Sequence, residues 1–180
     1  MTNTQAKTTK LAKMAMLVAI SIVLVALVHF PIFPAVAFLE YDPADIPILI
    51  GTFAFGPAAG IMLTVVTSVL QGITVSAQSG VYGIIMHIIA TATLTCVAGT
   101  IYRRNKSKKS AIIGLICGTI AMTAMMFCAN LIVTPFFMGT TREVVMSLMP
   151  FILAFNAAKA GINSVITFIL YKRISGFLHR

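Results

Sequence analysis

The segment PFILAFNAAKAGINSVITFILYKRI, residues 150–174, decides the class of fold to which the chain belongs. Most of its residues are apolar, and as a helix rising about 1.5 Å per residue it is long enough to cross a hydrocarbon core of about 30 Å. Two basic residues, Lys172 and Arg173, stand near its end, as at the cytoplasmic end of many membrane helices. The segment therefore predicts a transmembrane helix.

Comparable apolar runs recur along the whole chain. Of its 180 residues 59% are hydrophobic and 9% charged, and the mean hydropathy of +1.00 is far above the globular range. We predict an all-α membrane protein in which residues 1–180 form a single transmembrane domain. Its six transmembrane helices are expected at residues 9–29, 43–55, 58–75, 81–102, 111–134 and 150–174.

Basic residues gather in three short patches outside these runs. The first patch, at residues 7–13, precedes the first run; the second is 103–109; the third comprises Lys172, Arg173 and Arg180. With six helices all three patches fall on one side, so we expect both termini in the cytoplasm. A five-helix alternative would place the basic C-terminus outside. Because these patches account for the net charge of +9, nucleic-acid binding is not expected.

The first apolar run also resembles a secretory signal, because lysines precede it and Ala35-Val36-Ala37 imitates a cleavage site. More apolar runs follow, so we expect the first helix to be retained.

The predicted topology places the four acidic residues of the chain at or near the outer face. They are Glu40, Asp42, Asp45 and Glu143. We therefore expect no carboxylate inside the membrane and no bound inorganic ion. The three cysteines lack metal-ligand spacing, so no metal site is expected.

Two outer connections, residues 30–42 and 134–149, are long and unusually apolar. An apolar loop in water would be a liability, so each loop should cover something. The loops could pack on helix ends, or they could form a lid over a pocket.

Three polar residues interrupt the last predicted helix at helical spacing. Asn156, Lys159 and Asn163 lie three and four residues apart, which places them on one helix face. A charge in mid-membrane costs about 2.5–3.5 kcal/mol on insertion scales, so Lys159 is a functional candidate. Its alternatives are snorkelling to the interface or a structural contact between helices.

Other polar side chains are expected at a similar depth. Tyr82 and His87 lie in the outer half of the fourth predicted helix, and Asn130 lies in that of the fifth. Together with the polar face of the last helix they would line one pocket. Amides and one lysine among apolar side chains suit a flat heteroaromatic ligand with imide-type edges.

Catalytic motifs are missing from the sequence. Residues 51–57, GTFAFGP, have the glycine spacing of a phosphate loop but lack its Lys-Ser/Thr pair, and no zinc-protease motif or nucleophile elbow is present. We therefore expect neither ATP hydrolysis through this element nor another catalytic activity. Two alternatives are an intramembrane enzyme that uses Lys159 or His87 as a base, and a stand-alone secondary transporter, although neither inverted repeats nor intramembrane carboxylates are detected.

Two pairs of small residues lie four positions apart on predicted helices. They are Ala15 with Ala19 and Gly114 with Gly118. Such pairs let helices approach closely, either within one bundle or against a partner protein.

Three stretches carry a resemblance to a known family. They are FPIFPAVAFLEYDPADIPILIGTFAFGPAAGI (30–61), NLIVTPFFMG (130–139) and PFILAFNAAKAGINSVITFILYKR (150–173). The chain resembles the substrate-binding S components of energy-coupling factor (ECF) vitamin transporters, and most closely the riboflavin-specific members.

The resemblance implies a six-helix bundle that captures riboflavin as transported ligand, without a cofactor, in the plasma membrane of a prokaryote. It implies a transport subunit without its own ATPase site. It also implies three partner chains, a transmembrane coupling protein and two ATPase subunits, with Ala15 and Ala19 contacting the coupling protein. Another vitamin, such as folate, thiamine or pantothenate, is the alternative ligand. The implied substrate-binding residues are Leu39, Glu40, Tyr41, Tyr82, His87, Asn130, Thr134, Asn156, Lys159 and Asn163.

Overall fold

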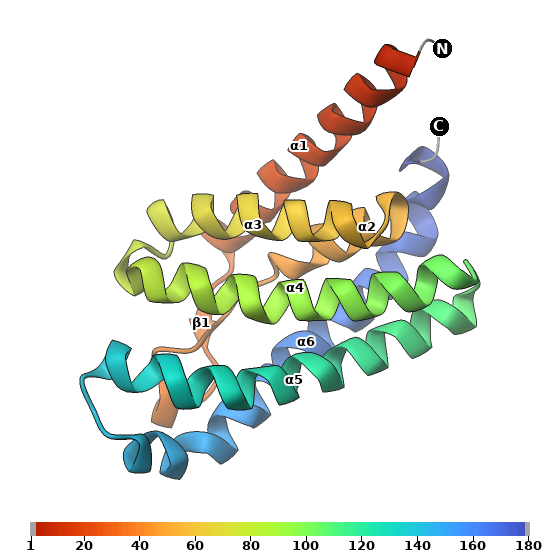
Figure 1. Cartoon of the computed structure of the whole chain (residues 1–180). Helices are drawn as coiled ribbons and strands as arrows, with labels where there is room; N and C mark the ends of the chain where they lie inside the picture. The colour runs from red at the N-terminus through yellow and green to blue at the C-terminus, as the bar shows by residue number, and fades with distance from the viewer. Residues whose placement is uncertain (1–2, 179–180) are drawn as a thin grey trace.

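The computed structural model describes residues 3–178 and is mostly helical (Figure 1). Arg180 and the side chain of Lys172 lie outside the described part. All six predicted helices are present. They are α1 (Asn3–Leu27), α2 (Asp45–Phe55), α3 (Pro57–Ile73), α4 (Gly80–Arg104), α5 (Lys108–Met138) and α6 (Arg142–Leu178). Four short elements join them: the strands β1 (Phe30–Pro31) and β2 (Glu40–Tyr41), and the 3-10 turns η1 (Pro34–Val36) and η2 (Ala77–Ser79).

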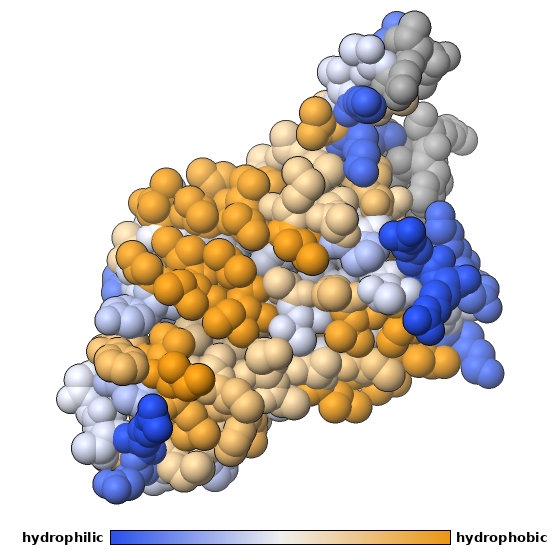
Figure 2. Space-filling view, viewed as in Figure 1, coloured by the Kyte–Doolittle hydropathy of each residue, from blue (hydrophilic) through white to orange (hydrophobic). Residues whose placement is uncertain are grey.

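Four helices are apolar and long enough to cross a membrane: α1, α4, α5 and α6. On the face shown in Figure 2, exposed apolar side chains form a broad band over α3, α4 and α5, while hydrophilic residues gather toward the ends of the molecule. This pattern confirms the prediction of an all-α membrane protein. The helix α2 has only 11 residues, so it rises about 16 Å and covers roughly half of a hydrocarbon core.

Residues 28–44 connect α1 to α2. Strand β1 pairs with β2 in antiparallel register, Phe30 opposite Tyr41, which folds this segment into a hairpin. Val36 is fully buried in an apolar cluster with Val145 and Ile152 of α6. The segment therefore packs into one end of the bundle, which we call the loop end. The chain termini and the α4–α5 turn lie toward the other end, called the basic end (Figure 1).

The prediction of a second long loop at residues 134–149 is wrong. Helix α5 continues through Pro135 and ends at Gly139, whose left-handed backbone (φ 61°, ψ 36°) lets Thr140 donate to the Pro135 carbonyl at 3.0 Å. Helix α6 then begins at Arg142, well before the expected residue 150. Pro135 lies inside α5, because membrane helices tolerate proline where neighbours pack against them.

The two pairs of small residues face in opposite directions. Gly114 and Gly118 are buried against α4, where a Cβ on Gly114 would lie 2.9 Å from the Ala98 carbonyl oxygen. That pair therefore serves the internal α4–α5 contact. Ala15 and Ala19 are exposed on the outward surface of α1, so they are free of internal packing.

Candidate ligand-binding site

A cavity of about 130 Å³ lies in the half of the bundle nearest the loop end. Its walls come from residues 28–44 and from helices α3, α4, α5 and α6, which are distant in sequence. Apolar side chains such as Phe38, Met86 and Phe155 cover part of the surface. The polar part is formed mainly by Glu40, Asp42, Gln71, His87, Asn156 and Lys159.

A second, smaller cavity of about 70 Å³ adjoins the first on the α4–α5 side. Tyr82, Asn130 and Thr134 line it, and the side chains of Leu39 and Met126 line both cavities. Pockets for small molecules typically measure roughly 300–1,000 Å³. A ligand of that size would therefore have to displace the side chains that separate the two cavities.

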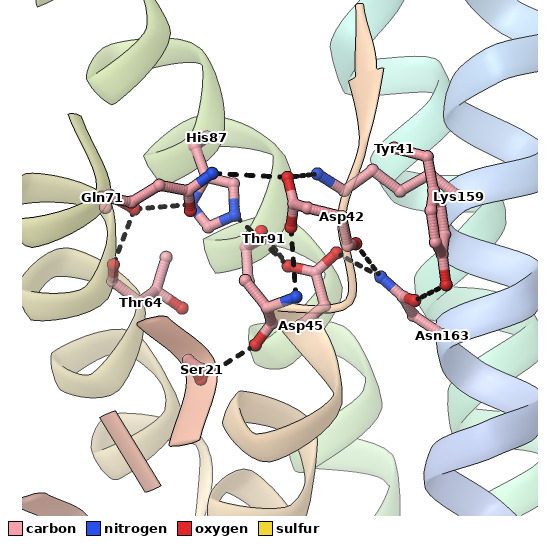
Figure 3. Close-up of polar contacts among 12 residues, drawn as sticks. Ser21, Tyr41, Asp42, Asp45, Thr64, Gln71, His87, Thr91, Lys159 and Asn163 are labelled. Atoms are coloured by element: carbon pink, nitrogen blue, oxygen red, sulfur yellow. Dashed lines mark hydrogen bonds and ion pairs between the residues drawn. The ribbon is translucent and has the colours of Figure 1, made fainter. Parts of the chain in front are cut away.

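The Lys159 ammonium is paired with a carboxylate inside the bundle. Its Nζ donates to Asp42 Oδ2 at 2.8 Å, and both side chains are buried (Figure 3). Asp42 and Asp45 were expected at or near the outer face, whereas the structure buries both carboxylates inside the bundle. The chain turns inward after β2, so α2 begins deep in the bundle and brings both carboxylates with it.

Asp42 receives hydrogen bonds from three further directions. Its Oδ1 accepts from the Ala44 amide at 3.1 Å, its Oδ2 accepts from Gln71 at 3.3 Å, and Asn163 donates to its backbone carbonyl. These donors and the adjacent Lys159 ammonium all favour the ionised form of the Asp42 side chain. Asp42 is therefore a carboxylate that orients the lysine.

Asp45 joins α2 to α4 and α6. Thr91 donates to its Oδ1 at 2.6 Å and Asn163 donates to its Oδ2 at 3.1 Å. The Nε2 atom of His87 lies 3.6 Å from the same Oδ1. Among residues 3–178 no group of three or more His, Cys, Asp or Glu side chains is placed to hold a metal ion.

Two of the sequence-predicted site residues lie behind the cavity wall. Tyr41 donates to Asn163 Oδ1 at 2.9 Å, and neither residue lines either cavity. Their bonds hold β2 against α6 and thereby position Asp42. The larger cavity is lined by Leu39, Glu40, His87, Asn156 and Lys159, and the smaller by Leu39, Tyr82, Asn130 and Thr134. Substrate contact by these residues stays a prediction.

The two amides at the cavities are held by their own helices. Asn130 donates to the Met126 carbonyl and Asn156 to the Ile152 carbonyl, each at 2.8 Å. Thr134 donates to Asn130 Oδ1 at 2.8 Å, which fixes the orientation of that amide further. These bonds satisfy donors that would otherwise be unpaired in the membrane.

The sequence analysis missed the polar face of α3. Thr64, Ser68 and Gln71 lie four and three residues apart, the same helical spacing that singled out the polar face of α6. Ser68 contacts His87 Nδ1 at 2.6 Å, and Gln71 reaches Asp42. The spacing predicts a polar helix face, but serine and threonine are common in membrane helices and do not by themselves indicate a binding site.

A family model described as "ECF transporter, substrate-specific component" matches residues 9–171. The chain therefore belongs to the substrate-specific S components of ECF transporters. It is a multi-pass membrane protein, in agreement with its apolar helices.

Known proteins similar to the chain fit this assignment. It is 32% identical over 178 residues to the riboflavin transporter RibU of Staphylococcus aureus (strain TCH60), covering 95% of this chain and 93% of that one. It is 27% identical to the riboflavin transporter FmnP of Bacillus subtilis (strain 168), covering 97% and 96%. A solved structure of the S component of a bacterial ECF transporter superposes with a TM-score of 0.82 at 33% identity, covering 97% of this chain and 99% of that chain.

Proposed function

We propose that this S component captures riboflavin and delivers it to an ATP-driven ECF importer. The observation that carries the proposal is the pair of adjoining cavities, whose walls combine amides and one oriented ammonium with apolar side chains. Riboflavin has the matching chemistry, because its flat ring has apolar faces and an imide edge. Similarity to two riboflavin transporters supports this ligand over folate, thiamine or pantothenate.

In the proposed complex the ring occupies the merged cavities. Met86, Met126 and Phe155 cover its faces, while the amides of Asn130 and Asn156 meet its polar edge. Lys159 donates to a ring acceptor and keeps its orientation through Asp42. Binding requires Phe38 and Leu39 to move, because these side chains lie between the two cavities.

Transport requires partner chains in this proposal. The basic end faces the cytoplasm, as the charge distribution of the sequence predicts. The outward surface of α1, with Ala15 and Ala19, contacts a transmembrane coupling protein, and two ATPase subunits supply the energy. The chain itself has no ATPase role.

The direct test is a flavin titration of the purified full chain in detergent. We expect saturable quenching of riboflavin fluorescence, with no competition from folate, thiamine or pantothenate at a hundredfold excess. Protein that purifies without a flavin absorption band and does not quench added riboflavin would contradict the proposal.

Riboflavin 5′-phosphate is expected to bind at least about tenfold more weakly than riboflavin, or by about 1.4 kcal/mol. Lys159 is the one Lys or Arg among the described residues that line the cavities, and Asp42 already neutralises it. A phosphate group would therefore enter beside the carboxylates of Asp42 and Glu40 without a free cation. Competition titrations with the two flavins measure the ratio, and equal affinities would contradict this reasoning.

A further inference from the structure

Two buried polar atoms at the larger cavity have no hydrogen-bond partner within the described residues. They are Oε1 of Gln71, on α3, and Nε2 of His87, on α4. Both residues line the cavity. A buried acceptor without a partner is costly, so the pair indicates a place where a bound molecule supplies donors.

The orientation of the Gln71 amide follows from its neighbours. Its Nε2 donates to Asp42 Oδ2 and to Ser76 Oγ, each at 3.3 Å. An ionised carboxylate only accepts hydrogen bonds, so the amide nitrogen must face Asp42. The carbonyl oxygen is consequently left as an acceptor of fixed orientation. Figure 3 shows the bond from Gln71 of α3 to Asp42.

The tautomer of His87 follows from Ser68 in the same way. The Ser68 hydroxyl donates to the Thr64 carbonyl at 2.7 Å, so it accepts from His87 Nδ1 at 2.6 Å. In the neutral imidazole Nε2 is then an acceptor. The Asp45 carboxylate, 3.6 Å away, only accepts hydrogen bonds, so it supplies no donor to this nitrogen.

We propose that Gln71 and His87 form a second binding wall that accepts hydrogen bonds from the ribityl hydroxyls of riboflavin. This inference rests on the proposed function and adds α3 to the binding site. The isoalloxazine ring offers a single N–H donor, whereas the ribityl chain carries several hydroxyls. Two fixed acceptors on neighbouring helices therefore match the chain, and the ring lies toward the amides of α5 and α6.

The test compares riboflavin with lumiflavin, which has the same ring but a methyl group in place of the ribityl chain. The variant Gln71→Met keeps the length of the side chain and removes the acceptor together with the Nε2 donor, while Asp42 keeps its bonds from Lys159 and the Ala44 amide. In titrations of the full chain in detergent, Gln71→Met is expected to weaken riboflavin binding at least about tenfold, the scale of one lost buried hydrogen bond. Lumiflavin affinity should change by less than about twofold, because the lost partner is absent from that ligand.

Two further variants test whether the loss of affinity is specific to the two acceptors. His87→Phe should show the same selective loss, because it keeps a ring and removes Nε2. Gln78→Met makes the substitution of Gln71→Met at an exposed amide that lines neither cavity, and it should change neither affinity. Lumiflavin binding also reports that each variant is folded.

The outcomes separate the two proposals. If Gln71→Met lowers both affinities equally, or neither, the second binding wall is refuted while riboflavin binding stands. The same holds if wild-type protein binds riboflavin and lumiflavin equally well. A water molecule that satisfies both acceptors beside the ligand would leave the ratio of the two affinities unchanged in the variants. If the wild type binds neither flavin, the proposed function itself fails.

Discussion

Replacing Asp42 by asparagine is expected to lower the free energy of unfolding by about 3–5 kcal/mol, because Lys159 is left buried without its counter-ion. The effect is large because the partner cannot reach water. Lys159 is 7% exposed and Asp42 4%. Chemical or thermal unfolding of the Asp42→Asn variant in detergent measures the loss. Riboflavin affinity should fall as well, since the ammonium loses the group that orients it.

A double variant separates the charge from the packing. Asp42→Asn combined with Lys159→Met removes both charges at nearly constant volume, so most of the stability should return while riboflavin binding stays impaired. Glu40→Gln is the matched control, because the Glu40 carboxylate makes only long, exposed hydrogen bonds of 3.4–3.5 Å with Gln78. It should cost less than about 1 kcal/mol. A single Asp42→Asn variant as stable as the wild type would show that the pair is not buried in the membrane.

Replacing Ala15 by tryptophan is expected to abolish riboflavin uptake while leaving riboflavin binding unchanged. The side chain lies on the outward surface of α1, where a large ring blocks close approach of a partner helix and disturbs no internal contact. Uptake by vesicles that contain the complete importer should fall at least about tenfold, which corresponds to about 1.4 kcal/mol of lost association. The titration of the isolated chain gives the binding.

An equally exposed site provides the control for this variant. Ile120 on α5 is 64% exposed, so Ile120→Trp places the same ring on another outward surface. It should spare both uptake and binding. If Ala15→Trp supports normal uptake, or if Ile120→Trp blocks it, the coupling surface is not the one formed by Ala15 and Ala19.

The helices were predictable because their signal is local. An apolar segment long enough to span the bilayer forms a helix wherever it lies in the sequence. The reason is that its backbone groups must hydrogen-bond to one another in lipid. The predicted end of the fifth helix at residue 134 was wrong. The left-handed Gly139 ends α5, and the packing of Val145 against Val36 stabilises the first turns of α6.

The cavity walls were predictable where a local pattern revealed them, as helical spacing did on α6 and as depth in the helix did for Tyr82, His87 and Asn130. Asn156, Lys159 and Asn163 do share one face of α6, and two of them line the larger cavity. The partner of Lys159 could not be predicted, because Asp42 lies 117 positions away in a segment that was expected outside the membrane. A carboxylate near a helix start is ordinarily solvated, so the sequence offers no local sign that this one is buried.

The order of residues along the chain therefore determined the membrane class, the six helices and the polar face of α6. Each of these depends on hydrophobicity and hydrogen bonding between near neighbours. Only the tertiary structure decided that residues 28–44 enter the bundle, that Asp42 neutralises Lys159, and that Gly114 packs inward while Ala15 faces outward. The reason is physical: the energy of a buried charge or a close helix contact depends on a partner that folding brings from far along the chain.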